Sequence, residues 1–172
     1  MPLKEGIFRY LLSILLGYVG WLILYEFFIL PKSLLDEFVI DALVRVSEQL
    51  LNFLGFNVTS NHGFWANTIS LDYFPGVWVS PNCDGLSVVA IFIIVVMSFP
   101  GEMKKRLYFI SIGVILIEIV NMLRIVSLSL IHRYHPQYLK FNHDYTFTVL
   151  VYAFVIFLWW WWFSWNDRSF SK

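Results

Sequence analysis

Long apolar runs separated by short polar segments dominate this sequence. Four runs have the length and composition of membrane spans, at about 7–30, 84–99, 107–131 and 145–165. Because a helix rises 1.5 Å per residue, about 20 apolar residues cross the ~30 Å hydrocarbon layer of a bilayer. The pattern therefore predicts an all-α integral membrane protein with about four transmembrane helices, forming one polytopic domain over residues 1–172.

The segment 33–54 has a different pattern, because apolar residues recur every three or four positions between charged ones. Ser33 is suited to cap such a helix, and Gly55 is suited to end it. We expect an amphipathic extracytoplasmic helix that lies on the membrane or against the bundle. Its main apolar stripe comprises Leu34, Phe38, Ala42, Val46 and Leu50, and it is joined by Leu35, Val39, Leu43, Leu51 and Leu54. Its polar side comprises Asp36, Glu37, Asp41, Arg45, Glu48 and Gln49.

The segment 57–81 shows no helical period and mixes Asn, Gly, Ser, Thr and Pro with aromatic residues. Such a composition is typical of turns, and aromatic side chains favour the membrane interface. We therefore expect a loop or a short hairpin outside the membrane.

The composition supports a membrane protein and excludes several kinds of binding site. The chain is 59% hydrophobic and only 14% charged, whereas soluble domains are nearer a quarter charged. Its formal net charge of zero gives no support for nucleic-acid binding. One cysteine excludes an intramolecular disulfide and thiolate zinc clusters. His132 and His135 are three residues apart, but no carboxylate or cysteine is suitably near, so we expect no metal and no cofactor.

Basic residues predict the orientation of the spans. Lys104, Lys105 and Arg106 form the densest basic cluster in a short loop, which the positive-inside rule assigns to the cytoplasm. With four spans, both chain termini are then cytoplasmic, and segments 31–85 and 132–144 are extracytoplasmic.

Three unusual residues reach the same outer level in this topology. Cys83 lies where a polar loop meets the second span, at the positive end of a helix dipole that favours a thiolate. His143 precedes the fourth span, and Arg124 lies inside the third. The alternatives are that the cysteine is a small buried apolar residue, and that Arg124 pairs structurally with Glu118 or Asn121.

A thiol and an imidazole together are the minimum requirement for acyl transfer through a thioester. A guanidinium nearby can favour the thiolate, bind an oxyanion or hold a substrate carboxylate. The sequence therefore permits a cysteine-dependent acyl transfer enzyme.

The motifs also resemble those of a known family. Asn82-Cys83-x-Gly85-Leu86 opens one span, Asn121-x-x-Arg124-Ile125 closes the next, and His143 precedes the last. This order is similar to that of the exosortase/archaeosortase family, and the chain length and third motif resemble the small exosortase F-type branch. The resemblance covers about residues 81–152.

The resemblance implies a membrane-embedded cysteine protease or transpeptidase of the bacterial inner membrane. Such an enzyme cleaves the C-terminal sorting signal of exported proteins at the outer face, through a cysteine thioester. The implied catalytic residues are Cys83, Arg124 and His143. The supporting residues around them are Asn82, Asp84, Gly85, Asn121 and Asp144.

Asp84 departs from the family pattern, which usually has serine after the cysteine. A neighbouring carboxylate disfavours a thiolate and so opposes the helix dipole. The other reading of Asp84 is that it orients His143 or Arg124.

Two other functions remain open. One is a non-enzymatic membrane subunit, such as an assembly factor or transporter component, with a structural intramembrane arginine and an inert Cys83. The other is a quinone-linked redox protein, which a single cysteine disfavours because that chemistry uses a cysteine pair.

Overall fold

The computed structural model describes residues 2–61, 67–80 and 83–170, with side chains described from residue 8 to residue 166 within these ranges. Its longer elements are α1 (Pro2–Leu24), α2 (Leu34–Phe53), α3 (Leu86–Ser98), α4 (Met103–Tyr134) and α6 (Phe147–Phe170). Short helical segments are η1 (Tyr25–Ile29), η3 (Pro136–Tyr138), α5 (Leu139–Phe141) and η4 (Asn142–Thr146). The strands are β1 (Val58–Asn61), β2 (Thr68–Leu71) and β3 (Val77–Trp78).

Three described helical stretches are long and apolar enough to cross a membrane, namely Phe8–Ile29, Met103–Tyr134 and Pro136–Asn166. The fourth apolar helix, Leu86–Ser98, is shorter. Its 13 residues extend over roughly 20 Å, less than the hydrocarbon thickness. The predicted all-α membrane fold is confirmed, with three long helices and one short helix that corresponds to the shortest predicted span, 84–99.

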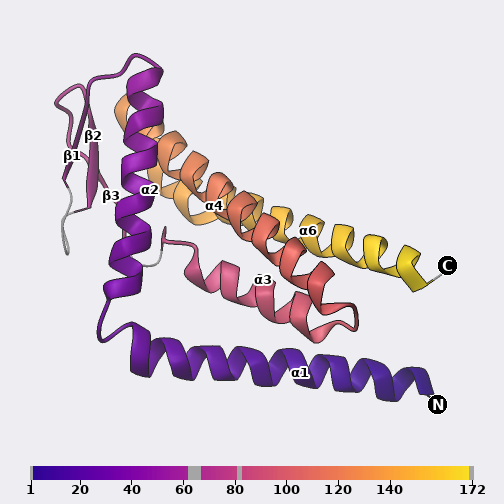
Figure 1. The fold of residues 1–172 in the computed structure, drawn as a ribbon. Coiled ribbons are helices and arrows are strands. Elements are labelled where there is room, and N and C mark those ends of the chain that lie inside the picture. The colour runs from indigo at the N-terminus through magenta and orange to yellow at the C-terminus, as the bar shows by residue number, and fades with distance from the viewer. Residues whose placement is uncertain (1, 62–66, 81–82, 171–172) are drawn as a thin grey trace.

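The apolar helices run side by side, and α2 crosses one end of them (Figure 1). α3 packs against α1, α4 and α6, whereas α2 packs against α4 and the sheet. The α3–α4 turn and the outer ends of α1 and α6 lie at the opposite end of the bundle from the sheet (Figure 1). The molecule therefore has a helical bundle and a separate layer across one of its ends.

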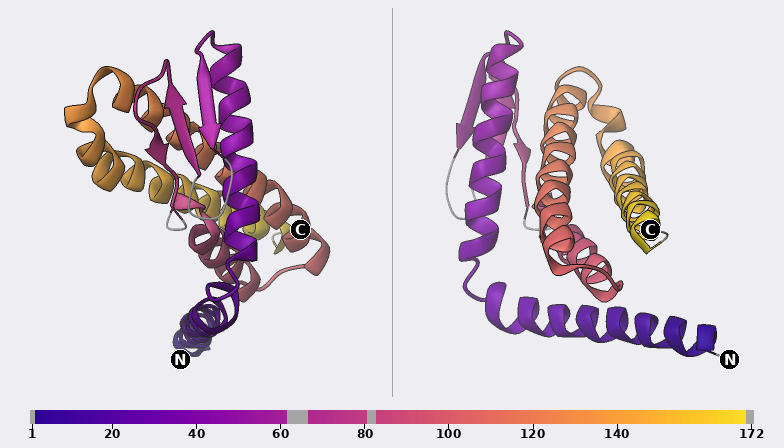
Figure 2. Two further views of the ribbon diagram at one scale, coloured as in Figure 1. Left: turned by 90° about the vertical axis from the view of Figure 1, so that its left-hand side faces the viewer. Right: turned by 45° about the vertical axis from the view of Figure 1, so that its right-hand side comes forward.

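The segment predicted as a loop or hairpin forms a three-stranded antiparallel sheet in the order β1-β2-β3. Val58 pairs with Leu71 in the first ladder, and Ile69 pairs with Val77 in the second. Figure 2 shows the sheet beside α2. Ile69 and Leu71 of β2 are buried on the protein side, so the sheet contributes to the core of the end layer.

Two apolar clusters correspond to these two parts. One joins α2, β2 and the later half of α4, and it includes Cys83. The other joins α3, α4 and α6 around buried aromatic residues such as Phe92, Phe109 and Trp162. Cys83 thus belongs to the apolar cluster of the end layer and lies just before α3, a helix of the bundle.

The prediction for the faces of α2 is partly wrong. The predicted apolar stripe is largely exposed, with Phe38 73% and Leu34 69% exposed. The packed face carries two polar residues, Asp36 and Ser47, among Ile40, Val44 and the predicted apolar residues Leu43 and Leu51. Helix α2 therefore has a buried face against the protein and a second apolar face directed outward.

Helix α2 begins and ends at the predicted positions, but its first residue is not capped by the expected side-chain hydrogen bond. Ser33 is the N-cap residue, yet it has a φ of 45° and makes no side-chain capping hydrogen bond. Gly55 follows the helix with a φ of 91°, the left-handed conformation that favours glycine.

Gly113 provides a test of the packing between α3 and α4. A Cβ atom at this position would overlap the ring of Phe92, which is fully buried. We predict that Gly113→Ala lowers the free energy of unfolding by about 1–3 kcal/mol, because the ring cannot move without disturbing the core. Thermal unfolding in detergent micelles measures the change.

The matched control is Gly20→Ala in α1, where an added Cβ meets nothing within 4 Å. That change should be neutral or stabilising by roughly 0.5 kcal/mol, since alanine favours helix. Equal midpoints for the two variants would show that the α3–α4 contact is looser than described.

Candidate active site

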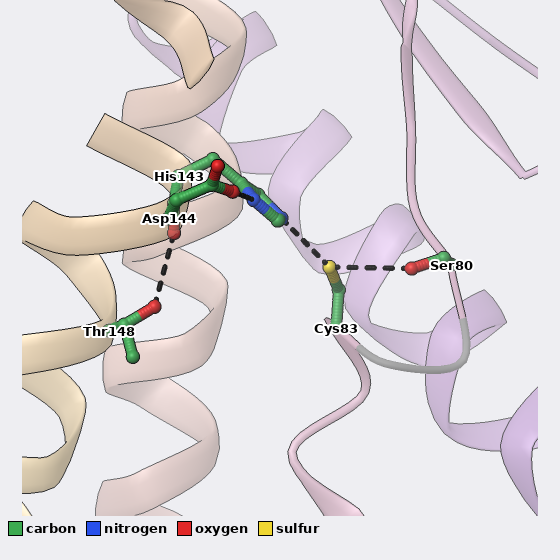
Figure 3. Close-up of polar contacts among 5 residues, drawn as sticks. All are labelled: Ser80, Cys83, His143, Asp144 and Thr148. Carbon is green, nitrogen blue, oxygen red and sulfur yellow. Dashed lines mark hydrogen bonds and ion pairs between the residues drawn. The ribbon is translucent and has the colours of Figure 1, made fainter. Parts of the chain in front are cut away.

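Cys83 and His143, 60 residues apart in sequence, meet at the bundle end that carries the sheet. Cys83 Sγ lies 3.4 Å from His143 Nε2, within hydrogen-bonding distance for sulfur (Figure 3). Cys83 is 9% exposed and His143 is partly exposed, so the thiol is sheltered while the imidazole is open on one side. The arrangement allows a proton to pass directly between sulfur and nitrogen.

The Cys83 segment is fixed by backbone hydrogen bonds. The buried Asn121 side chain on α4 donates through Nδ2 to the carbonyl oxygen of Cys83, at 3.0 Å. The Cys83 N–H donates to the carbonyl of Ser80, at 2.8 Å. Gly85 has a φ of 81°, and a Cβ there would lie 3.0 Å from Asn121 Nδ2. The glycine therefore allows both the turn and its close approach to α4.

Cys83 precedes helix α3, as predicted for a thiol where a polar loop meets the second span, but the helix begins slightly later than the predicted residue 84. Helix α3 begins at Leu86, and Gly85 is its N-cap. The N–H of Leu86 is satisfied by Asp84 Oδ1, at 2.9 Å. The side chains that contact Cys83 Sγ are His143 and Ser80, whose hydroxyl lies 3.5 Å away (Figure 3). Side-chain donors, more than the end of α3, surround the sulfur.

His143 is oriented by its own neighbours. Its Nδ1 lies 2.9 Å from Asp144 Oδ1, so the carboxylate favours the tautomer or cation with a proton on Nδ1. Both residues belong to the π-helical turn η4, and the hydroxyl of Thr148 donates to the carbonyl of His143 at 3.1 Å. The wider turn directs His143 Nε2 toward Cys83 (Figure 3).

Arg124 lies one helical turn beyond Asn121 on α4. Its Nε is buried without a hydrogen-bond partner, and within the described part of the chain it pairs with neither Glu118 nor Asn121. It is also not joined to Cys83 or His143 by a hydrogen bond among these residues. The structure therefore brings two of the three predicted catalytic residues into contact, whereas Arg124 makes no hydrogen bond to either of them among the described residues.

Among the described residues, Asp84 makes no hydrogen bond to His143 or to Arg124, the two residues that it was alternatively read to orient. Its carboxyl group contacts Leu86 N–H and the carboxyl group of Asp36 on α2. Burial, followed by the contact with Asp36, raises the pKa of Asp84 to about 8, although the Leu86 N–H acts in the opposite direction. Asp144 is the carboxylate that orients the histidine. Asn82 lies outside the described residues.

Sequence reasoning missed Ser80, Thr148 and the part played by Asp36. Ser80 and Thr148 carry no pattern that distinguishes them from other hydroxyl residues. Asp36 was predicted on the polar side of its helix, yet it precedes Ile40, Val44 and Leu51 on the packed face. The helical spacing of Asp36, Ile40, Val44 and Leu51 places one acidic residue on a face that is otherwise apolar, and this pattern could have been found in the sequence.

A comparison with protein families finds a match. The family model described as transmembrane exosortase matches residues 7–162. No curated protein and no solved structure matches the chain. The match extends well beyond the three short motifs and includes α2 and the sheet. The chain belongs to the transmembrane exosortase family.

Proposed function

We propose that this protein is a cysteine protease or transpeptidase that cleaves the C-terminal sorting signal of exported proteins. The observation that carries the proposal is the 3.4 Å separation of Cys83 Sγ and His143 Nε2, with Asp144 on the other ring nitrogen. Thiol, imidazole and carboxylate in this order form the arrangement used by cysteine hydrolases.

The reaction begins with transfer of the thiol proton from Cys83 to His143 Nε2. The thiolate attacks the scissile carbonyl carbon, and the electron pair of the C=O bond moves to oxygen. His143 then gives its proton to the departing amine nitrogen as the C–N bond breaks, leaving a thioester on Cys83. Water or an amine acceptor attacks the thioester, His143 takes its proton, and the proton returns to the released sulfur.

Arg124 supplies positive charge for this reaction. An unpaired buried guanidinium N–H is costly, so the resting site favours an anionic or carbonyl oxygen beside it. The oxyanion that forms on attack is such a group, and stabilisation of developing charge is a large part of acyl-transfer catalysis. Arg124 is therefore proposed to act on the transition state, after substrate has entered.

The proposed location is the periplasmic face of the bacterial inner membrane. Lys104, Lys105 and Arg106 lie at the opposite end of the bundle from the sheet, and a basic turn favours the cytoplasm. Both chain termini are then cytoplasmic, and Cys83 and His143 face the periplasm. An exported substrate has its folded part in the periplasm, so its C-terminal signal would reach Cys83 from the periplasmic side.

A lipid-facing groove between α2, α3 and α4 is the proposed seat of the substrate's membrane helix. It has a volume of about 460 Å³ and is lined almost entirely by apolar side chains, including Phe38, Ala42, Val46, Val89 and Ile119. Leu86 and Glu118 also line it, and Leu86 directly follows the Cys83 turn. A helix packed here would deliver the residues that precede it to the thiol.

Filling the groove should impair processing without changing the thiol. We predict that Ala42→Trp slows cleavage of a membrane-anchored substrate about tenfold, because the indole occupies the space of the incoming helix. The rate of Cys83 alkylation should be unchanged. Val149→Trp, at a 66% exposed position on α6, is the matched control and should process normally. Normal processing by Ala42→Trp would place the substrate helix elsewhere.

Cys83 is the only cysteine, so thiol labelling of the purified chain reports on this residue alone. We predict that iodoacetamide alkylates the wild type at about pH 6.5 roughly ten times faster than His143→Asn, because the imidazole removes the thiol proton. Mass spectrometry of the chain in detergent micelles measures the rate. His135→Asn, at an exposed histidine outside the site, should behave as wild type. Equal rates in all three proteins would favour the non-enzymatic subunit.

Cleavage in cells tests the whole proposal. The probe is an exported protein with a C-terminal membrane helix and basic cluster, chosen because it accumulates uncleaved when this chain is deleted. We predict that Cys83→Ala abolishes its cleavage and that Arg124→Ala reduces the rate by about a hundredfold, since charge stabilisation is lost. Arg45→Ala, which removes an exposed arginine of α2, should have no effect. Full cleavage by Cys83→Ala at normal membrane abundance would refute the mechanism.

A further inference from the structure

Two buried carboxyl groups from different elements meet beside the Cys83 turn. Asp36 on α2 is 1% exposed, and Asp84, the residue after Cys83, is 3% exposed. The side chain of Asp36 acts on Asp84 and, after burial, is the next cause of the raised pKa of Asp84. The reaction proposed above uses neither of them.

The hydrogen bonds of the pair leave one oxygen of each carboxyl group without a donor. The hydroxyl of Tyr25 in η1 donates to Asp36 Oδ1 at 2.8 Å, and the N–H of Leu86 donates to Asp84 Oδ1 at 2.9 Å. Asp36 Oδ2 and Asp84 Oδ2 are both buried and have no partner among the described residues. Ionised carboxylates only accept hydrogen bonds, so these groups attract each other only if one carries a proton.

We propose that Asp36 and Asp84 share one proton and that this proton tethers the Cys83 turn to α2. The pair is a positioning device: Tyr25 orients Asp36, Asp36 holds Asp84 through the proton, and Asp84 caps α3 and adjoins the thiol. The tether exists whatever the chain catalyses. Only its consequence for the nucleophile rests on the proposed function.

The surrounding charges favour retention of the proton. Burial is the largest cause that raises the pKa of Asp84, and the two charged groups that add to it, Asp36 and Glu118 of α4, are both acidic. Together they raise the pKa of Asp84 from 3.8 to about 8. A proton held more tightly in the folded chain stabilises it fully below the ordinary pKa of the group, and this contribution is lost as pH rises toward about 8.

Loss of the proton turns the tether into a repulsion. Two carboxylates in contact in a buried site disfavour the packing of the Cys83 turn on α2. The Asn121 hydrogen bond to Cys83 then holds the turn from the α4 side alone. We expect the turn to loosen at alkaline pH in the wild type.

Two amide variants test the tether. In Asp36→Asn the amide nitrogen donates permanently to Asp84, and in Asp84→Asn it donates to Asp36, so each keeps a hydrogen bond and removes the shared proton. Unfolding of the full-length chain in micelles is followed between about pH 6 and pH 8. As pH rises, the folding equilibrium constant should decrease more steeply for the wild type than for either variant. The difference should be up to about a factor of ten per pH unit, the effect of one proton held in the folded state. Asp41→Asn, at a partly exposed acid of α2 paired with Arg45, should keep the wild-type slope.

Infrared spectroscopy gives a second readout on the wild type itself. We expect a carbonyl stretching band of a protonated carboxyl group at neutral pH that disappears near pH 8. The contribution of the pair to this band should be lost in Asp36→Asn and retained in Glu118→Gln, which separates the pair from its acidic neighbour. A wild type without this band, or with the same pH slope as both amide variants, overturns the tether. Thiol alkylation with His143→Asn decides the catalytic proposal independently.

Discussion

The hydrogen bond from Asn121 to the carbonyl of Cys83 is the constraint on which the site depends. It joins the turn before α3 to the middle of α4, and it requires Gly85 to bring the two backbones together. An amide buried at this depth needs a partner, so the apolar surroundings enforce the bond. Because α3 and α6 both pack on α4, fixing the turn on α4 also fixes its distance from His143 at the start of α6.

The sequence was sufficient for the elements and for the family motifs. Apolar runs of this length indicate transmembrane helices, because few other structures bury so many consecutive apolar residues. The short polar motifs between the runs must then lie at or near the ends of these helices. Cys83, Asn121 and His143 were therefore identifiable before their contacts were known. The short length of α3 followed less clearly, since its apolar run includes Phe99 and reaches the turn at Pro100.

Tertiary contacts decide what the sequence could not. Helix α2 is apolar on two faces, so periodicity alone could not tell that Phe38 lies outward and Asp36 inward. Asp84 and Asp144 each neighbour a reactive residue in sequence, and both were plausible partners of His143. Only the direction of the turns assigns Asp144 to the imidazole and Asp84 to α3 and α2. The unpaired Arg124 was equally unpredictable, because spacing along α4 permits a pair with Asn121 that does not form.

Charge balance gives a physical reason for an aspartate beside the nucleophile. A lone carboxylate after Cys83 would oppose formation of the thiolate, and a second one from α2 would oppose it further. A proton shared between Asp36 and Asp84 reduces the pair to a single negative charge, spread over two buried groups. One oxygen of Asp84 then remains available to accept the N–H of Leu86, which would otherwise be unpaired at the start of α3. Sharing a proton thus lets Asp84 accept the hydrogen bond from Leu86 while the negative charge beside the Cys83 thiol stays low. This holds as long as the pH is below the value at which the pair loses the proton.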